Sequence, residues 1–283
     1  MTMRIVVVAS LVASMVQAQP AATAAPRKPI QDNSFLLEEA YNQEPGVVQH
    51  ISSLLFDRSI HTWVYALTDE WPLLGQRHQV SFTIPIQNST AGNTVALGDV
   101  ALNYRLQLVG SGETRLAITP RVSVVLPIGA EELGESNLAF QAALASSYVA
   151  TRALALHTNV GMQRTPGVDL VLGGNTSLTD FVVGQSAIWL VHPRVNLLLE
   201  TVLTNEEQLT GAGADKIRAT GITVSPGIRW SHDFSSGLQI VPGLAFPIGF
   251  RANEGQRGVL LYLSFEHPIP GLADRKQKKL ITD

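Results

Sequence analysis

The stretch TRLAITPRVSVVLP, residues 114–127, alternates apolar with polar or small side chains at almost every position. Leu116, Ile118 and Val122 lie on one edge of this stretch, and Arg115 and Arg121 lie on the other. Alternation with a period of two indicates a β-strand, because successive side chains point to opposite faces. Strands of soluble proteins run about 5–6 residues, whereas a tilted strand needs roughly 9–11 to cross a bilayer. The stretch is therefore long enough to cross a membrane with its apolar edge toward lipid.

Similar patterns recur through most of the chain. Residues 99–108 and 221–230 repeat the division into an apolar and a polar face, while 47–56 and 179–191 alternate poorly. We predict about twelve strands, at 47–56, 60–69, 78–87, 94–108, 114–127, 137–149, 152–163, 179–191, 194–204, 219–231, 237–248 and 257–266.

The links between these segments differ in length in a regular way. Short links at 109–113, 150–152, 192–194 and 233–237 alternate with longer polar or glycine-rich links at 88–93, 129–137, 164–177, 205–218 and 250–258. An up-and-down barrel with an even number of strands has its termini and tight turns at the periplasmic end. The first two links, near 57–59 and 72–79, do not follow this rule. We predict an all-β, antiparallel, up-and-down transmembrane β-barrel over residues 47–267.

Aromatic residues lie near the ends of several predicted strands, as interfacial girdles do in membrane barrels. They are Trp71, Tyr104, Tyr148, Trp189 and Trp230.

Four prolines oppose the barrel interpretation. Pro85, Pro120, Pro226 and Pro242 lie in the middle of predicted strands. Each removes one ladder hydrogen bond, and a closed barrel has no edge at which this loss is harmless. Bulges would accommodate some of them.

The N-terminus reads as an export signal. A positive start at Arg4 precedes an apolar run too short for a membrane helix, and small residues end at Ala18. We predict a signal peptide at 1–18 and a leader at 19–46. Residues 32–46 could form a short helix, either plugging the lumen or lying in the periplasm. Residues 268–283 are predicted to be a polar tail.

Composition limits the class of protein further. The chain has no cysteine, which excludes disulfides and thiolate metal sites. Charged residues make up only 15% of it, against about 25% in typical proteins, and the formal net charge is −3. No apolar run after Ala18 approaches the roughly 18 residues of a transmembrane helix. A nucleic-acid partner would require a dense basic face, which is missing.

If the apolar faces contact lipid, the alternate faces line a lumen, because charges in hydrocarbon cost a few kcal/mol each. One interpretation is a polar conduit that selects permeants, and the other is a paired network that fills a closed lumen. The candidate lumen-lining and selectivity residues are Asp99, Arg105, Arg115, Arg121, His157, Glu200, Arg229 and Glu266.

A lipid hydrolase is the rival from the enzyme class. His50 and Ser52 share a strand face, but the sequence shows no third residue to orient the histidine. The remaining histidines are scattered without paired spacing, so we predict no catalytic site, no metal site and no cofactor. A further alternative is a closed structural or adhesive barrel that binds a partner through 164–177 and 205–218.

Three stretches carry a family resemblance: DNSFLLEEAYNQEPGVVQHI (32–51), TDEWPLLGQRHQVSFTIP (68–85) and GDVALNYRLQL (98–108). They resemble a family of bacterial outer-membrane β-barrel transporters associated with the phenol meta-cleavage degradation pathway. The resemblance implies outer-membrane location in a Gram-negative-type envelope and uptake of small molecules, with hydrophobic or aromatic compounds as candidates. QRGVLLYLSF (256–265) also resembles the C-terminal signal that the barrel-assembly machinery recognises, although Glu266–Asp283 follow it.

Overall fold

A computed structural model describes residue 30 and residues 34–88, 94–112, 114–130, 137–171, 173–210, 215–236 and 238–269. The predicted signal peptide, the leader up to residue 29 and the tail from residue 270 lie outside the described residues. Among the described residues, no helix is long and apolar enough to cross a membrane.

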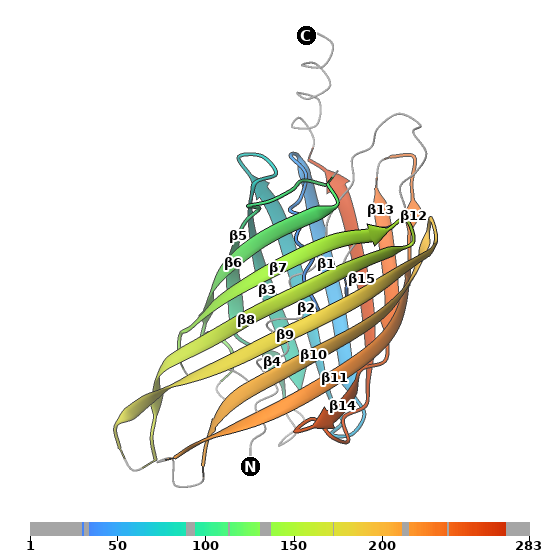
Figure 1. Ribbon diagram of the computed structural model, residues 1–283. Coiled ribbons are helices and arrows are strands. Elements are labelled where there is room, and N and C mark those ends of the chain that lie inside the picture. Colours follow the sequence, from blue (N-terminus) through green and yellow to red (C-terminus); the bar gives the residue numbers. More distant parts are fainter. Residues whose placement is uncertain are drawn as a thin grey trace.

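The described residues form a closed antiparallel barrel (Figure 1). Three barrel strands are each split in two, as β4–β5, β11–β12 and β13–β14, so that fifteen elements make twelve barrel strands. Closure comes from the pairing of the first strand with the last, in which Val47 lies opposite Pro268. The elements are β1 (Val47–Asp57), β2 (Thr62–Leu73), β3 (His78–Asn88), β4 (Val95–Leu97), β5 (Val100–Leu106), β6 (Leu116–Leu126), β7 (Ala139–Thr151), β8 (Leu154–Asp169), β9 (Asn175–His192), β10 (Val195–Leu209), β11 (Lys216–Trp230), β12 (His232–Asp233), β13 (Gln239–Ala245), β14 (Ile248–Arg251) and β15 (Gly258–Pro268).

Side chains alternate between the inside and the outside of this wall. On β10, Asn196 and Glu200 are fully buried, whereas Leu197 and Leu199 are 43% and 40% exposed. On most other strands, too, the charged residues are buried inside and exposed leucine, valine and phenylalanine lie outside, although some apolar residues such as Leu198 and Val202 also face inward. A soluble protein would have the opposite arrangement, since apolar side chains leave water most readily. The period-two pattern thus predicted correctly which face is apolar and exposed.

Outward aromatic residues mark two levels on the barrel. We call the end where β1 begins and β15 ends the terminal end, and the opposite end the loop end. On β7 and β9, Phe140 and Phe181 lie toward the loop end, and Tyr148 and Trp189 lie eight positions further on, at the terminal end. Eight residues span roughly 27 Å of strand, or about 20 Å along the axis of a barrel with the usual tilt. This height is close to the apolar band of about 25 Å expected of a membrane barrel.

The four mid-strand prolines lie where one of the two neighbouring ladders is interrupted. Pro85 lies opposite the break between β4 and β5, and Pro120 lies just past the last pair of the β5–β6 ladder. Pro226 lies opposite the break between β13 and β14, and Pro242 opposite the break between β11 and β12. A residue in an antiparallel strand directs its N–H toward one neighbour only, so a proline costs little where that ladder is already broken. The interruptions therefore resolve the objection that the prolines raised.

Two sequence predictions need correction. Residues 34–46 form bends and a turn rather than the predicted short helix, while 31–33 lie outside the described residues. The predicted loops at 164–177 and 205–218 are largely strand, because β8, β9, β10 and β11 continue past the other strands at the loop end (Figure 1). Polar outward residues such as Arg164 and Arg218 hydrogen-bond across these extensions, and their polarity broke the apolar pattern.

Candidate channel lumen

The barrel interior brings together most of the predicted lumen residues. Arg105, Arg121 and His157 are 1–2% exposed, and Glu200 and Arg229 are fully buried. Asp99 and Glu266, at 2% and 5% exposure, also belong to the buried interior.

Arg115 is the exception. It precedes the first residue of β6, so its exposed side chain turns to the carbonyls of Val149 and Ala150 and lies over the ring of Tyr148. The structure does not bring it together with the interior charges.

The interior also contains a piece of the chain itself. Residues 34–43, which we call the lumen segment, have every side chain buried within the barrel. The segment contacts the walls formed by β8–β11 at its start and the walls formed by β3, β5 and β6 at its end. It joins β1 through the turn at Pro45–Gly46. Of the two positions predicted for this region, the structure shows the one inside the barrel.

Backbone groups at the start of the lumen segment are bound by wall side chains. The Glu200 carboxylate accepts hydrogen bonds from the amides of Phe35 and Leu36, at 3.1 and 2.8 Å. Asn159 accepts from the Glu38 amide at 2.6 Å and donates to the Glu38 carbonyl at 2.8 Å. These contacts replace the hydrogen bonds that an irregular buried backbone would otherwise lack.

The second half of the segment is held in the same manner. The amides of Asn42 and Gln43 donate to side-chain oxygens of Gln107 and Gln79, at 3.0 and 2.7 Å. The Tyr41 hydroxyl donates to a backbone carbonyl of the β5–β6 connection at 2.7 Å. Burial, and then the carboxylate of Glu39, raise the pKa of Tyr41.

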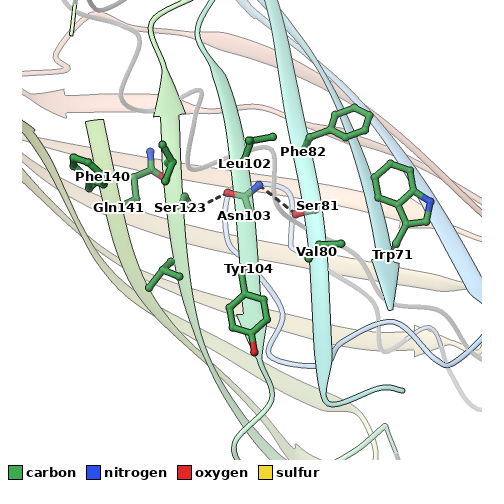
Figure 2. Close-up of a pocket in the computed structure, with 12 residues that line it drawn as sticks. Trp71, Val80, Ser81, Phe82, Leu102, Asn103, Tyr104, Ser123, Phe140 and Gln141 are labelled. Atoms are coloured by element: carbon green, nitrogen blue, oxygen red, sulfur yellow. Dashed lines mark hydrogen bonds between the residues drawn. The ribbon is translucent and has the colours of Figure 1, made fainter. Parts of the chain in front are cut away.

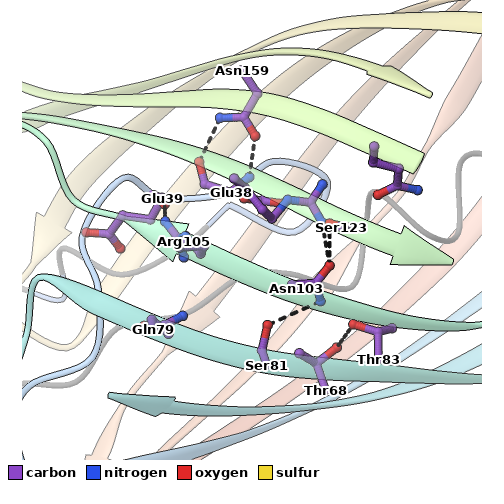
Figure 3. A network of polar contacts seen from close by, with 12 residues as sticks. Glu38, Glu39, Thr68, Gln79, Ser81, Thr83, Asn103, Arg105, Ser123 and Asn159 are labelled. Atoms are coloured by element: carbon purple, nitrogen blue, oxygen red, sulfur yellow. Dashed lines mark hydrogen bonds and ion pairs between the residues drawn. The ribbon is translucent and has the colours of Figure 1, made fainter. Parts of the chain in front are cut away.

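An ion pair anchors the segment at its centre. Arg121 Nε lies 2.8 Å from Glu38 Oε1, with both side chains buried. Figure 3 shows the network that continues along the wall, in which Arg121 and Ser123 both donate to Asn103, at 2.9 and 2.7 Å. Asn103 in turn donates to Ser81 at 3.2 Å. Breaking a buried pair by removing one partner is costly, so this network strongly favours the docked segment.

Glycines in the wall make room for the apolar side chains of the segment. The ring of Phe35 lies against Gly227 and Gly243, and Leu37 lies against Gly184. A Cβ at any of these glycines would overlap the segment, so no other residue fits without movement. Phe35 also contacts the ring of Tyr262, with 5.3 Å between the ring centres.

A cavity of about 620 Å³ lies in the wall formed by β2, β3, β5, β6 and β7 (Figure 2). Its aromatic lining residues, Trp71, Phe82, Tyr104 and Phe140, belong to the outward face, while Asn103 belongs to the inward face. It is therefore mainly a hollow of the apolar outer surface and not the candidate pore.

The geometry around His50 and Ser52 does not suit a hydrolase. The two ring nitrogens of His50 contact Asp69 and His267, at 2.6 and 3.1 Å. The Ser52 hydroxyl bonds instead to the Tyr65 hydroxyl, at 3.1 Å. Nucleophile activation requires a hydrogen bond between the serine and the histidine, and both histidine nitrogens are engaged elsewhere.

Sequence reasoning left open whether the lumen segment enters the barrel, and it missed the glycines that receive the segment. One signal was available: Gly184, Gly227 and Gly243 all fall on inward positions of their strands. Three inward positions without a side chain leave space that something else must fill, because protein interiors are densely packed.

Comparison with solved structures finds similar chains, of which the first supports the fold. The COG4313 outer membrane channel from Pseudomonas putida F1 is 15% identical, with a TM-score of 0.54 over 87% of this chain and 99% of that one. The NanC porin is 11% identical, with a TM-score of 0.48 over 76% and 98% of the two chains. The KdgM porin is 7% identical, with a TM-score of 0.45 over 77% and 98%. Neither a family model nor a curated protein matches the sequence.

Proposed function

We propose that this protein is an outer-membrane channel for the passive or selective uptake of small molecules. The observation that supports this proposal is the inverted polarity of a closed barrel, with exposed apolar side chains outside and buried charges inside. Only a membrane makes that arrangement favourable, since the outer face contacts hydrocarbon and the inner face surrounds a polar axis. The likeness in fold to the COG4313 outer membrane channel is consistent with the proposal.

The lumen segment limits which solutes can pass. It crosses the interior from the wall at Glu200 to the wall at Gln79, so a permeant must pass beside it or wait for it to move. A barrel of twelve strands lies between the filled eight-stranded barrels and the open sixteen-stranded porins. Small solutes are therefore the expected permeants, with hydrophobic or aromatic compounds as candidates on the family resemblance.

Selectivity is assigned to the interior charges. Arg105, Arg121 and Arg229 supply positive charge, while Glu200 and Glu266 supply negative charge. Rings of charged side chains set the ion preference of many pores. Arg121 is buried against Glu38 of the segment, so a permeant meets its charge when the segment moves aside.

Planar-bilayer recording tests this proposal. The purified full chain should conduct, and Arg121→Gln should shift the reversal potential in a salt gradient toward greater cation preference. Arg115→Gln removes the same charge outside the lumen and is the matched control, for which no shift is expected. Retained heat-dependent mobility on gels confirms that each variant is folded.

Two results would contradict the proposal. A folded wild-type barrel that passes no current and swells no liposomes with sugars, amino acids or phenolics would be a closed structural barrel. Equal reversal potentials for wild type and Arg121→Gln would contradict the assigned selectivity while leaving the channel itself intact.

A further inference from the structure

A polar cluster lies on the outward face where the barrel closes. His50 is on β1, Asp69 on the neighbouring strand β2, and His267 on the last strand, β15. The two histidines are separated by 217 positions in the sequence and meet because β1 pairs with β15. The cluster is at the terminal end, where Asp69 precedes Trp71 on β2 by two residues. The proposed channel function does not use it.

Each histidine has its Nδ1 bound to an acceptor. His50 Nδ1 lies 2.6 Å from the Asp69 carboxylate, and His267 Nδ1 lies 3.2 Å from the carbonyl oxygen of Pro268. A carboxylate and a carbonyl can only accept, so both Nδ1 atoms carry the hydrogen. In the neutral form of each ring, Nε2 then has a free lone pair.

The two Nε2 atoms point toward each other. They are 3.1 Å apart, and the ring centres are 5.2 Å apart with the planes 17° from parallel. In rings that meet edge to edge, the distance between ring centres exceeds the distance between the nitrogens by the two centre-to-nitrogen distances. The observed difference is almost that large, so the two rings meet edge to edge. Two lone pairs that converge at this distance repel unless a cation lies within reach of both nitrogens. That cation is either a proton or a metal ion.

The surroundings meet two conditions of a metal site. Histidines that bind metals almost always donate the other ring N–H to a carboxylate, a backbone carbonyl or water, and here both do so. With metal–nitrogen bonds of about 2.0–2.1 Å, tetrahedral geometry places two ligand nitrogens roughly 3.3 Å apart, close to the observed 3.1 Å. Imidazole nitrogens suit zinc, copper and nickel.

We propose that His50 and His267 bind a divalent transition metal ion, with Zn²⁺ as the reference, through their Nε2 atoms. In the described part of the chain no group of three histidine or acidic side chains could enclose a metal ion, so water supplies the other ligands. Asp69 orients His50 and is a positioning residue. The ion links the first strand to the last and stabilises barrel closure.

Zinc binding by the full, untagged chain in detergent tests this inference. After treatment with a chelator, the wild type should take up one Zn²⁺ per barrel in competition with a chromophoric chelator, and zinc should raise the temperature of unfolding. His50→Gln and His267→Gln should each weaken binding at least tenfold and remove the thermal shift. Asp69→Asn should weaken binding by about 10–100-fold, the usual effect of losing such a partner.

His232→Gln removes an exposed outward histidine elsewhere and should bind zinc as the wild type does. Copper bound to the wild type should show electron paramagnetic resonance couplings to two imidazole nitrogens, a measurement that needs no variant to fold. Absence of saturable zinc binding, or binding unchanged in both His50→Gln and His267→Gln, would mean that the histidines share only a proton and would overturn the proposal.

Discussion

Replacing Phe35 by alanine should release the lumen segment from the barrel wall. The ring is only 1% exposed and fills the space above Gly227 and Gly243. Truncating a buried phenylalanine to alanine costs about 3–5 kcal/mol, and the lower value is appropriate where water can enter the space. The polar anchors, including Glu200 on the Phe35 amide, remain in the variant.

A loss of about 3 kcal/mol changes the ratio of docked to undocked segment roughly a hundredfold, since each 1.4 kcal/mol is a factor of ten. A segment undocked about 0.1% of the time would then be undocked about 10% of the time. In planar bilayers, the fraction of time that single barrels spend in their larger-conductance state should rise by this factor.

Phe250→Ala is the matched control. Its ring is 47% exposed on the outward face of β14, so its removal should leave conduction unchanged. If Phe35→Ala is folded and inserted but its open fraction equals that of the wild type, docking of the lumen segment does not govern conduction and the reasoning is refuted.

Three further predictions follow from the wall. Gly184→Val should displace Leu37 and raise the open fraction. Adding Leu37→Ala should lower the open fraction again. A double variant as open as Gly184→Val would contradict direct contact between position 184 and Leu37. Thr201 lies midway between the positions on β10 that face Trp189 and Phe181, so Thr201→Lys should cost about 2–4 kcal/mol of folding into vesicles, read from urea titration. Asn205→Lys, at the band edge, should cost about 0–1 kcal/mol, because the cost of a charge depends on its depth in the bilayer, and equal costs would disprove the assigned band. Ser52→Ala should leave lipid-ester hydrolysis at the background level of the wild type, and hydrolysis that disappears with this change would revive the hydrolase.

The strands were predictable because a membrane wall imposes one rule on every residue. Alternate side chains meet lipid, so the period-two pattern appears wherever the chain crosses the apolar band. The pattern failed on β8–β11 beyond the band, where polar residues such as Glu207 and Arg218 pair across the outward face and apolar alternation is no longer required.

The interior charges were predictable for the same reason, and Arg115 shows where the reasoning fails. Side chains alternate between the two faces only inside a strand, and β6 begins one residue after Arg115. Once the strand ends, the side chain is free to turn to nearby carbonyls.

Alternation along the chain, read from the sequence alone, determined an all-β barrel of twelve strands and the face on which most charges lie. The tertiary structure decided what the barrel encloses and which distant residues meet. The alternating pattern specifies which face a side chain lies on but not which residue it contacts. His50 lies beside His267 because β1 pairs with β15 when the barrel closes. The lumen segment likewise has no periodic pattern to reveal it, because its backbone is held by the wall's own side chains and not by a regular ladder.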